Sequence, residues 1–144
     1  MGRTVWSGIA IATGLVMSAS GARATELLFN MFVPPAHLMN TKIMVPWTKA
    51  VETATAGRVT FKIPPRSIAP PPRQFDIVRT SVSDMAYQFN AFLLKRVPLV
   101  QIGMLPLLYT SAEAHAVALW RTYKKFFEAK HQYDGVVLLG FIAS

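Results

Sequence analysis

Short apolar runs alternate with amphipathic segments along most of this 144-residue chain, and this alternation restricts its possible folds more than any other feature. In "RVTFKI", Val59, Phe61 and Ile63 alternate with polar residues, which is the period of a half-buried strand. The run 136–142, "VVLLGFI", is almost continuously apolar, as in a strand that parallel neighbours bury on both faces. Strands that alternate with helices predict an α/β fold with a mostly parallel sheet flanked by helices.

Two further strands are predicted, at 26–32 ("ELLFNMF") and 84–89 ("DMAYQF"). The first predicted helix follows Asn40, a possible N-cap, contains Pro46 and ends at Gly57. The proline either kinks this helix or marks its start. The apolar face of the helix has helical spacing and consists of Ile43, Trp47, Ala50, Val51 and Ala54.

The loop 64–72, "PPRSIAPPP", connects the strand "RVTFKI" to a second helix. Pro72 lies where the first turn begins, because its fixed φ suits that position and its missing N–H needs no partner there. The apolar residues of this helix are Phe75, Ile77, Val78 and Val82. The prolines therefore hold a strand-to-helix loop at the carboxyl edge of the strands, where open α/β sheets bind ligands.

A third helix is predicted behind a capping box formed by Thr110 and Glu113. Its apolar face consists of Ala116, Trp120, Tyr123 and Phe127. A turn at 133–135 then leads into the apolar run that ends the predicted sheet. The full order is β-α-β-α-β-loop-α-β.

Residues 1–24 have the pattern of a secretory signal peptide. Arg3 supplies the positive charge, 5–17 is mostly apolar, and "ARA" before Thr25 has the form that signal peptidase accepts. An uncleaved anchor is the alternative, but the apolar segment is shorter than the roughly 20 residues of a membrane-spanning helix. We therefore expect cleavage after Ala24, a periplasmic location, and one domain at 25–144. That domain has no cysteine, so packing alone must stabilise it.

The net charge of +8 falls to +6 when the leader is removed, because Arg3 and Arg23 are lost with it. The remaining chain has 13 basic and 7 acidic residues. Such a balance suits nucleic acid, an anionic membrane or anionic small molecules. The basic residues are scattered and no nucleic-acid-binding motif accompanies them, so we expect no nucleic-acid partner. No catalytic or metal-binding motif is present and the three histidines are far apart, so we predict no enzyme, no metal and no cofactor.

Three aromatic residues, Phe32, Tyr87 and Phe89, lie near the predicted carboxyl ends of strands. They form either an aromatic wall that faces a ligand or ordinary packing, and the sequence leaves both interpretations open. The other aromatic residues on helical faces, including Trp47 and Trp120, are predicted to lie in the core.

Four blocks in order resemble the periplasmic solute-binding subunit of TRAP transporters, of the DctP type: "FNMFVPPAHLMN", "WTKAVETATAGRVTFKI", "APPPRQFDIVRTSVSDMAY" and "LPLLYTSAEAHAVALWRTYKKF". The resemblance runs from about residue 27 to residue 143. It implies a periplasmic-binding-protein-like (type II-like) fold of two lobes. Residues 25–144 would then be an incomplete first lobe, truncated before the second.

The resemblance also implies a function. Members of this family are monomers that capture a small organic acid between their lobes and deliver it to a membrane permease. The positions that match the ligand-facing loops of the family are Phe32, His37, Pro71, Pro72, Gln88, Phe89 and Asn90. The prolines among them would stiffen one wall of the cleft, so that less entropy is lost when the ligand is bound.

Three departures from the family pattern affect this expectation. Arg66 stands where relatives have a glycine, and "LLKRVPL" replaces a more polar turn. The family's arginine that pairs with the substrate carboxylate has no match here, and Arg73 and Arg79 are predicted to face solvent. Without the family's arginine and the second lobe, we expect weak binding. As an isolated half, the chain should also expose apolar surface and be marginally stable or aggregate. The alternatives are an exported basic α/β domain that binds polyanions or an anionic membrane, and a non-functional fragment.

Overall fold

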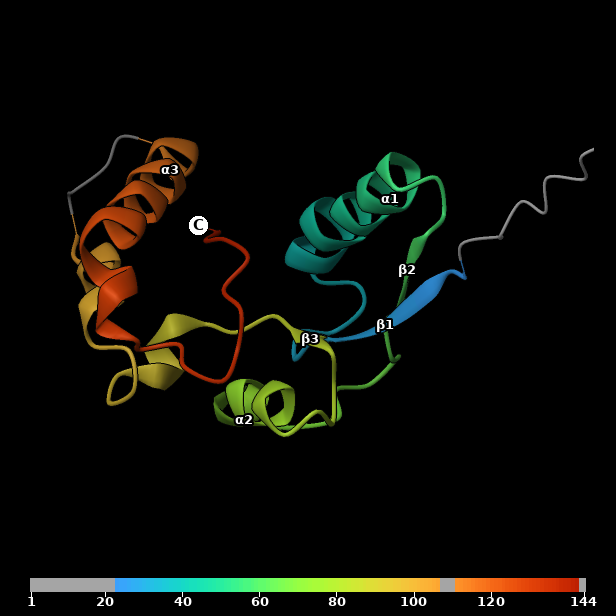
Figure 1. Cartoon of the computed structure of the whole chain (residues 1–144), viewed down its shortest axis with the longest axis horizontal. Helices are drawn as coiled ribbons and strands as arrows, with labels where there is room; N and C mark the ends of the chain where they lie inside the picture. The colour runs from blue at the N-terminus through green and yellow to red at the C-terminus, as the bar shows by residue number, and fades with distance from the viewer. Residues whose placement is uncertain (1–22, 107–110, 143–144) are drawn as a thin grey trace, which may run out of the picture.

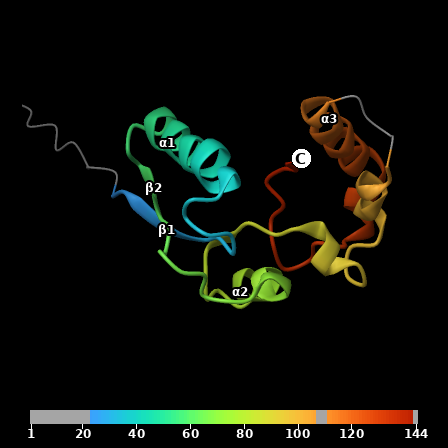
Figure 2. The same cartoon turned by 180° about the vertical axis from the view of Figure 1, so that it is seen from behind.

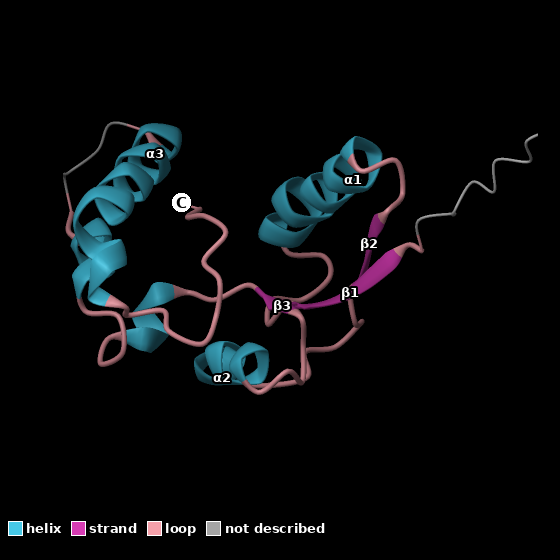
Figure 3. Ribbon diagram, viewed as in Figure 1, coloured by secondary structure: helices cyan, strands magenta, loops and turns pink. Residues whose placement is uncertain are grey.

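The computed structural model describes residues 23–106 and 111–142. Its strands form one parallel sheet in the order β2-β1-β3 (Figures 1 and 3). Strand β1 spans Thr25–Asn30, β2 spans Val59–Lys62 and β3 spans Met85–Ala86. The parallel sheet predicted from the sequence is confirmed, but within the described residues it has three strands and not four.

Strand β3 is short, and side chains reinforce its pairing with β1. Only Met85 and Ala86 join the ladder, so most of the strand predicted at 84–89 lies outside it. The N–H of Leu28 donates to the carboxylate of Asp84 at 2.7 Å, and the hydroxyl of Ser83 donates to the carbonyl of Leu28 at 2.8 Å. These bonds fix the chain just before β3 to the central strand.

Helix α1 spans Val45–Ala54 and follows a π-helical turn, Met39–Met44. Pro46 lies in the first turn of α1, so it marks the start of the helix, which is one of its two predicted roles. The helix ends close to Gly57, but the C′ position predicted for this glycine is occupied by Ala56, with a φ of +50°, and Gly57, with a φ of +75°, follows it. Asn40 is not an N-cap: it lies inside the π-helical turn, is 6% exposed, and donates to the carbonyl of Pro35.

The buried face of α1 is rotated by about one residue from the predicted face. Met44 and Thr48 are buried, whereas Ile43 and Trp47 are each 38% exposed. The hydroxyl of Thr48 donates to a carbonyl of the preceding helical turn at 2.9 Å, so this polar side chain is buried without an unpaired group. Trp47 lies at the edge of the core rather than inside it, and its ring packs against Phe61.

Helix α2 spans Gln74–Arg79 and is preceded by a 3-10 turn, Pro71–Arg73. Pro72 therefore lies in the first helical turn, as predicted, although Pro71 is the residue that begins it. Phe75 is buried on the predicted face, whereas Val82 lies beyond the helix and is 51% exposed.

Helix α3 spans Ala112–Thr122 and continues into a π-helical turn that ends at Phe127. Its capping residue is Ser111, whose hydroxyl accepts from the N–H of Ala114 at 3.1 Å. The prediction of Thr110 as the cap is therefore wrong by one residue, and Thr110 itself lies outside the described residues. Ser111 has the extended backbone that a capping residue needs, three positions before its partner.

The segment 136–142 is not a strand, although the sequence predicts one. Side chains alternate only from Val136 to Leu139: Val136 and Leu138 pack on the core, whereas Val137 is 83% and Leu139 is 61% exposed. Phe141 breaks the alternation and also packs on the core. A parallel strand requires a neighbour that pairs with its backbone. In the described part of the chain, no strand pairs with this segment.

Two groups of buried side chains hold the fold together. The first lies between β1 and the start of α1 and contains Phe29, Met31 and Met44. The second lies between α2, the 3-10 turns after β3, and α3, where the chain returns on itself (Figure 2). Its buried members are Phe75, Leu93, Val97, Val100, Tyr123 and Tyr133.

The leader predicted at 1–24 lies almost entirely outside the described residues. Among the helices that the structure describes, none is both long and apolar enough to cross a membrane. Several large apolar side chains are exposed, as predicted, including Leu38 and Leu94 at 69% and 60%.

We predict that Tyr133 makes the stability of the chain sensitive to alkaline pH. Burial raises the pKa of Tyr133 above its usual value, and the neighbouring Tyr123 raises it further. In the unfolded chain the phenol ionises near pH 10, whereas in the folded chain it stays protonated. This contribution is therefore present below about pH 10 and is lost as the pH rises above it.

Thermal melts of wild type and Tyr133→Phe, followed by circular dichroism between about pH 8 and about pH 11, test this prediction. The wild-type midpoint should fall more steeply above about pH 10 than that of Tyr133→Phe. Parallel curves for the two proteins would show that Tyr133 is not the responsible group.

Candidate functional site

Four aromatic side chains meet at the carboxyl ends of β1 and β3. The rings of Phe32 and Tyr87 are stacked, with centroids 5.3 Å apart and planes inclined by 13°. Phe92 meets Phe32 edge to face at 6.0 Å, and Phe89 meets Phe92 at 5.9 Å. We call these four residues the aromatic cluster.

The aromatic cluster combines the two interpretations that the sequence leaves open. Phe32 and Tyr87 are half-buried and pack on each other, whereas Phe89 and Phe92 are 41% and 44% exposed. Sequence reasoning singled out three of the four and missed Phe92. The sequence signal for Phe92 was weak: it is an aromatic residue five positions after Tyr87, in a segment whose apolar residues follow neither helical nor strand spacing.

A buried polar network lies at the end of β1. Asn30 and Gln74 are both 0% exposed, and the amide of Asn30 donates to the side-chain carbonyl of Gln74 at 2.6 Å. The side-chain oxygen of Asn30 accepts from the N–H of Ile68 at 2.9 Å. Gln74 in turn donates to the carbonyl of Ala69 at 2.8 Å. Ser67 joins both amides through its hydroxyl.

This network fixes the proline-containing loop in place. Its partners at residues 67–69 lie in the loop, while Asn30 lies on the central strand and Gln74 starts α2. The prolines that follow restrict the backbone further, and Pro70 has an extended conformation. The loop is thus held by side-chain amides as well as by its prolines, and the sequence predicted only the role of the prolines. The missed signal was an asparagine within an apolar strand.

The other polar residues predicted at the site bond to the fold itself. His37 lies in the loop after β1, is exposed, and its Nδ1 accepts from the N–H of Met39 at 3.1 Å. Gln88 accepts from the N–H of Phe75 at 3.1 Å, within the first turn of α2. Asn90 accepts from the hydroxyl of Tyr133 at 3.4 Å and so turns toward the second core. Their role toward a ligand stays a prediction.

Two hollows border this edge. One, of about 390 Å³, is lined by residues that include Pro72, Phe92, Lys95 and Arg96. The other, of about 270 Å³, is lined by residues that include Phe32, Arg66 and Ser67, and Pro71 is not among the lining residues of either. Both volumes are close to the range of small-molecule sites, about 300–1,000 Å³.

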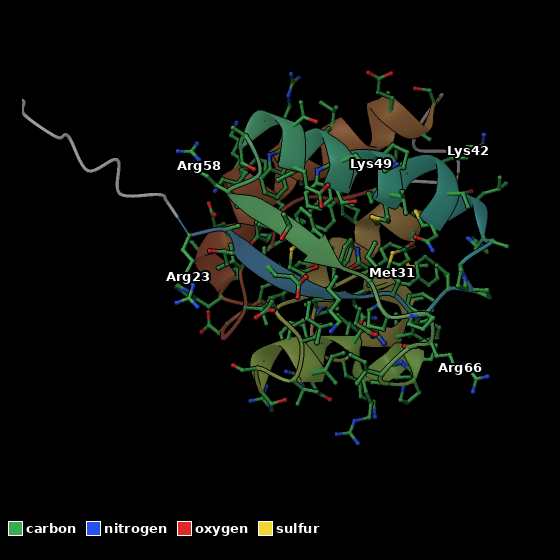
Figure 4. The ribbon with its side chains drawn as sticks, turned by 90° about the vertical axis from the view of Figure 1, so that its right-hand side faces the viewer. Arg23, Met31, Lys42, Lys49, Arg58 and Arg66 are labelled. Carbon is green, nitrogen blue, oxygen red and sulfur yellow. The ribbon has the colours of Figure 1, made fainter. Side chains whose placement is uncertain are left out.

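Charge at this edge is positive and partly paired. Arg96 forms an ion pair with Asp76 at 3.3 Å, and its guanidinium carbon lies 4.4 Å from the centre of the Phe75 ring. Arg66 points away from the ribbon into solvent (Figure 4). Burial raises the pKa of Tyr87 above its ordinary value, which further favours the neutral phenol. Among the described residues, no group of three histidines or carboxylates could hold a metal ion.

We predict that Asn30→Ala destabilises the chain by about 2 to 4 kcal/mol, because it leaves the buried carbonyl of Gln74 and the N–H of Ile68 without partners. Gln74→Ala should cost a similar amount. The double variant should cost less than the sum, since removing both partners leaves fewer unpaired groups.

Urea unfolding of the three variants measures these differences. Thr53→Ala is the control: its exposed hydroxyl bonds only within α1, so its effect should stay within about 0.5 kcal/mol. Strictly additive effects of Asn30→Ala and Gln74→Ala would contradict a coupled network.

The structure is similar to solved periplasmic solute-binding proteins. One is a TRAP periplasmic solute-binding protein from Bordetella bronchiseptica with bound (R)- and (S)-mandelate, with a TM-score of 0.77 and 31% identity over 81% of this chain and 37% of that chain. Another is a marine metagenome TRAP solute-binding protein specific for aromatic acid ligands, in complex with 3-hydroxybenzoate. It has a TM-score of 0.73 and 26% identity, covering 82% of this chain and 37% of that one.

A curated relative is "Outer membrane transporter protein TsaT" from Comamonas testosteroni, 39% identical over 121 residues. The match covers 84% of this chain and 36% of the relative, so the chain spans little more than a third of the length of these proteins. The family model for DctP, described as "Bacterial extracellular solute-binding protein, family 7", matches residues 29–144. The predicted family and fold are both confirmed: the chain belongs to family 7 of the bacterial extracellular solute-binding proteins, the DctP family.

Proposed function

We propose that the chain captures a small organic acid and delivers it to the membrane permease of a TRAP-type transporter. The observation that carries this proposal is the fold match over 81% of the chain to a TRAP protein with bound mandelate. The second neighbour binds 3-hydroxybenzoate, which is also a monocarboxylate. Both neighbours are solute-binding proteins, and the proposed mechanism is capture rather than catalysis.

In this proposal, residues 25–144 supply one wall of the cleft, as the first of two lobes. The ligand reaches the carboxyl edge of the sheet, where the loops after β1, β2 and β3 converge. The lobes close around it, and the closed monomer docks on the permease. The loop held by Asn30 and Gln74 is already ordered before the ligand arrives, so binding costs less conformational entropy.

The net charge favours an anionic ligand but does not by itself select one. In Figure 4 the labelled basic residues Lys42, Arg58 and Arg66 point outward in different directions. These three side chains therefore do not form one basic patch of the kind that binds polyanions. Binding to a polyanion or an anionic membrane would instead show as strong salt dependence together with indifference to small acids.

We predict that replacing both Pro71 and Pro72 with glycine weakens the binding of a small carboxylate by up to about tenfold, since the loop would lose order in the free protein. The measurement is a ligand-observed NMR titration of the chain with benzoate, which detects binding in the millimolar range. The chain is expressed with its own leader and purified from the periplasmic fraction.

Pro98→Gly is the matched control, because Pro98 is also a proline at the start of a 3-10 turn, as its N-cap, but lies outside both hollows. Its affinity should equal that of the wild type. If the double glycine variant also binds like the wild type, the prolines do not order the cleft. If the wild type binds no small carboxylate, the proposed function is wrong.

We further predict that the exported chain begins at Thr25, because signal peptidase would cleave after Ala24. Intact-mass spectrometry of the periplasmic fraction tests this position. Ala24→Arg should block processing, since the cleavage site requires a small residue there, whereas Glu26→Gln, beyond the site, should leave it unchanged. An intact chain that begins at Met1 and stays with the membrane would contradict this prediction.

A further inference from the structure

The aromatic cluster leaves two ring surfaces exposed on a base that the fold fixes. Tyr87 is fixed by its own backbone, whose N–H donates to the carbonyl of Asn30 at 3.1 Å, and its ring stacks on Phe32. Phe92 and Phe89 continue outward from this pair, inclined by 76° to each other. The exposed rings are therefore held in position before any ligand arrives.

The ring contacts follow the geometry that aromatic groups prefer. The three centroid distances, 5.3, 6.0 and 5.9 Å, all lie within the favourable range of about 4.5–7 Å. The angles are those of one stacked pair and two edge-to-face pairs. A further ring placed against Phe92 would extend the same array. A saturated ring of the same size would gain burial but not the electrostatic part of the contact.

Cationic side chains line the same hollows as two rings of the cluster. The hollow beside Phe92 has Lys95, Arg96 and also Asp76 in its wall. Arg96 is paired with Asp76 at 3.3 Å, whereas Lys95 has no ion pair among the described residues and is the cation that an anionic ligand would meet there. Arg66 lines the hollow beside Phe32, but its side chain points toward solvent. A ring contact next to a cation suits a ligand that carries both an apolar ring and a negative charge. The hollow beside Phe92 is the better candidate, because Phe92 is 44% exposed and Phe32 is half-buried.

We propose that the aromatic cluster, through Phe92 and Phe89, selects carboxylic acids that carry an aromatic ring over aliphatic acids of the same size and charge. This inference rests on the proposed function, since it concerns the same cleft. It assigns the choice of substrate class to this lobe, and specifically to the side chains that follow β3.

The test compares benzoate with cyclohexanecarboxylate, which have the same charge and the same number of ring carbons. Both are titrated by ligand-observed NMR into the periplasmically expressed chain. The wild type should bind benzoate more tightly, by on the order of five- to tenfold. Phe92→Leu should remove this preference, while its affinity for cyclohexanecarboxylate stays within about twofold of wild type, because leucine keeps most of the apolar contact.

Phe126→Leu is the matched control. Phe126 is 57% exposed on the π-helical turn after α3, with Lys125 near its ring and no contact with the aromatic cluster among its ring contacts. This variant should keep the full preference for benzoate. Phe89→Leu is a second test variant for use if Phe92→Leu lowers the melting temperature, and it should also reduce the preference.

The possible outcomes separate the two proposals. If the wild type binds neither acid, the proposed function fails and the selection fails with it. If it binds both acids equally well, capture of organic acids stands and selection of aromatic acids is overturned. If the preference for benzoate survives in both Phe92→Leu and Phe89→Leu, the aromatic cluster does not make the selection.

Discussion

The hydrogen bond between Asn30 and Gln74 is the interaction on which the rest of the candidate site depends. Both side chains are completely buried, so neither amide can exchange its partner for water. Asn30 lies at the carboxyl end of the central strand and Gln74 begins α2. Their pairing at 2.6 Å therefore sets where the helix starts relative to the sheet. An apolar pair would fill the space without fixing the loop between them.

The same two amides order the loop that follows β2. They bond to the N–H of Ile68 and the carbonyl of Ala69. The backbone of the loop is therefore attached to the central strand and to the start of α2 just before the three prolines. A proline restricts its own φ, but it does not by itself determine how a loop is oriented relative to the sheet. The amides supply that direction, and the prolines limit the alternatives. Together they present Pro72 to the hollow that Phe92 also lines.

The sequence predicted the elements that have a clear period and missed those that depend on distant partners. Val59 and Phe61 lie in a parallel strand, and Pro72 lies in a first helical turn, because local alternation and backbone geometry decide both. The prediction for the buried face of α1 was wrong. The hydroxyl of Thr48 donates within its own helix, so this polar residue can occupy a buried position where an apolar one was expected. The strand predicted at 136–142 was wrong because pairing requires a neighbour that periodicity does not reveal.

The candidate site shows the same division between local and distant information. The positions of Phe32 and Phe89 could be predicted, because both end predicted strands. The polar partners of Gln88 and Asn90 could not, since these partners, Phe75 and Tyr133, come from other parts of the chain.

These bonds have a consequence for recognition. The side chains of Gln88 and Asn90 bond to the fold, and the amides of Asn30 and Gln74 are buried under the loop. The apolar surface exposed beside them is the outer face of Phe89 and Phe92. A wall of this kind distinguishes ligands by their rings much better than by their hydroxyl groups, because an apolar surface barely rejects an added hydroxyl. Under the proposed function, the charge of the acid would be met by cationic side chains beside this wall, such as Lys95, or by the second lobe. Ring and charge would be recognised by different surfaces, so a variant of Phe92 should alter the choice among acids without abolishing the capture of acids.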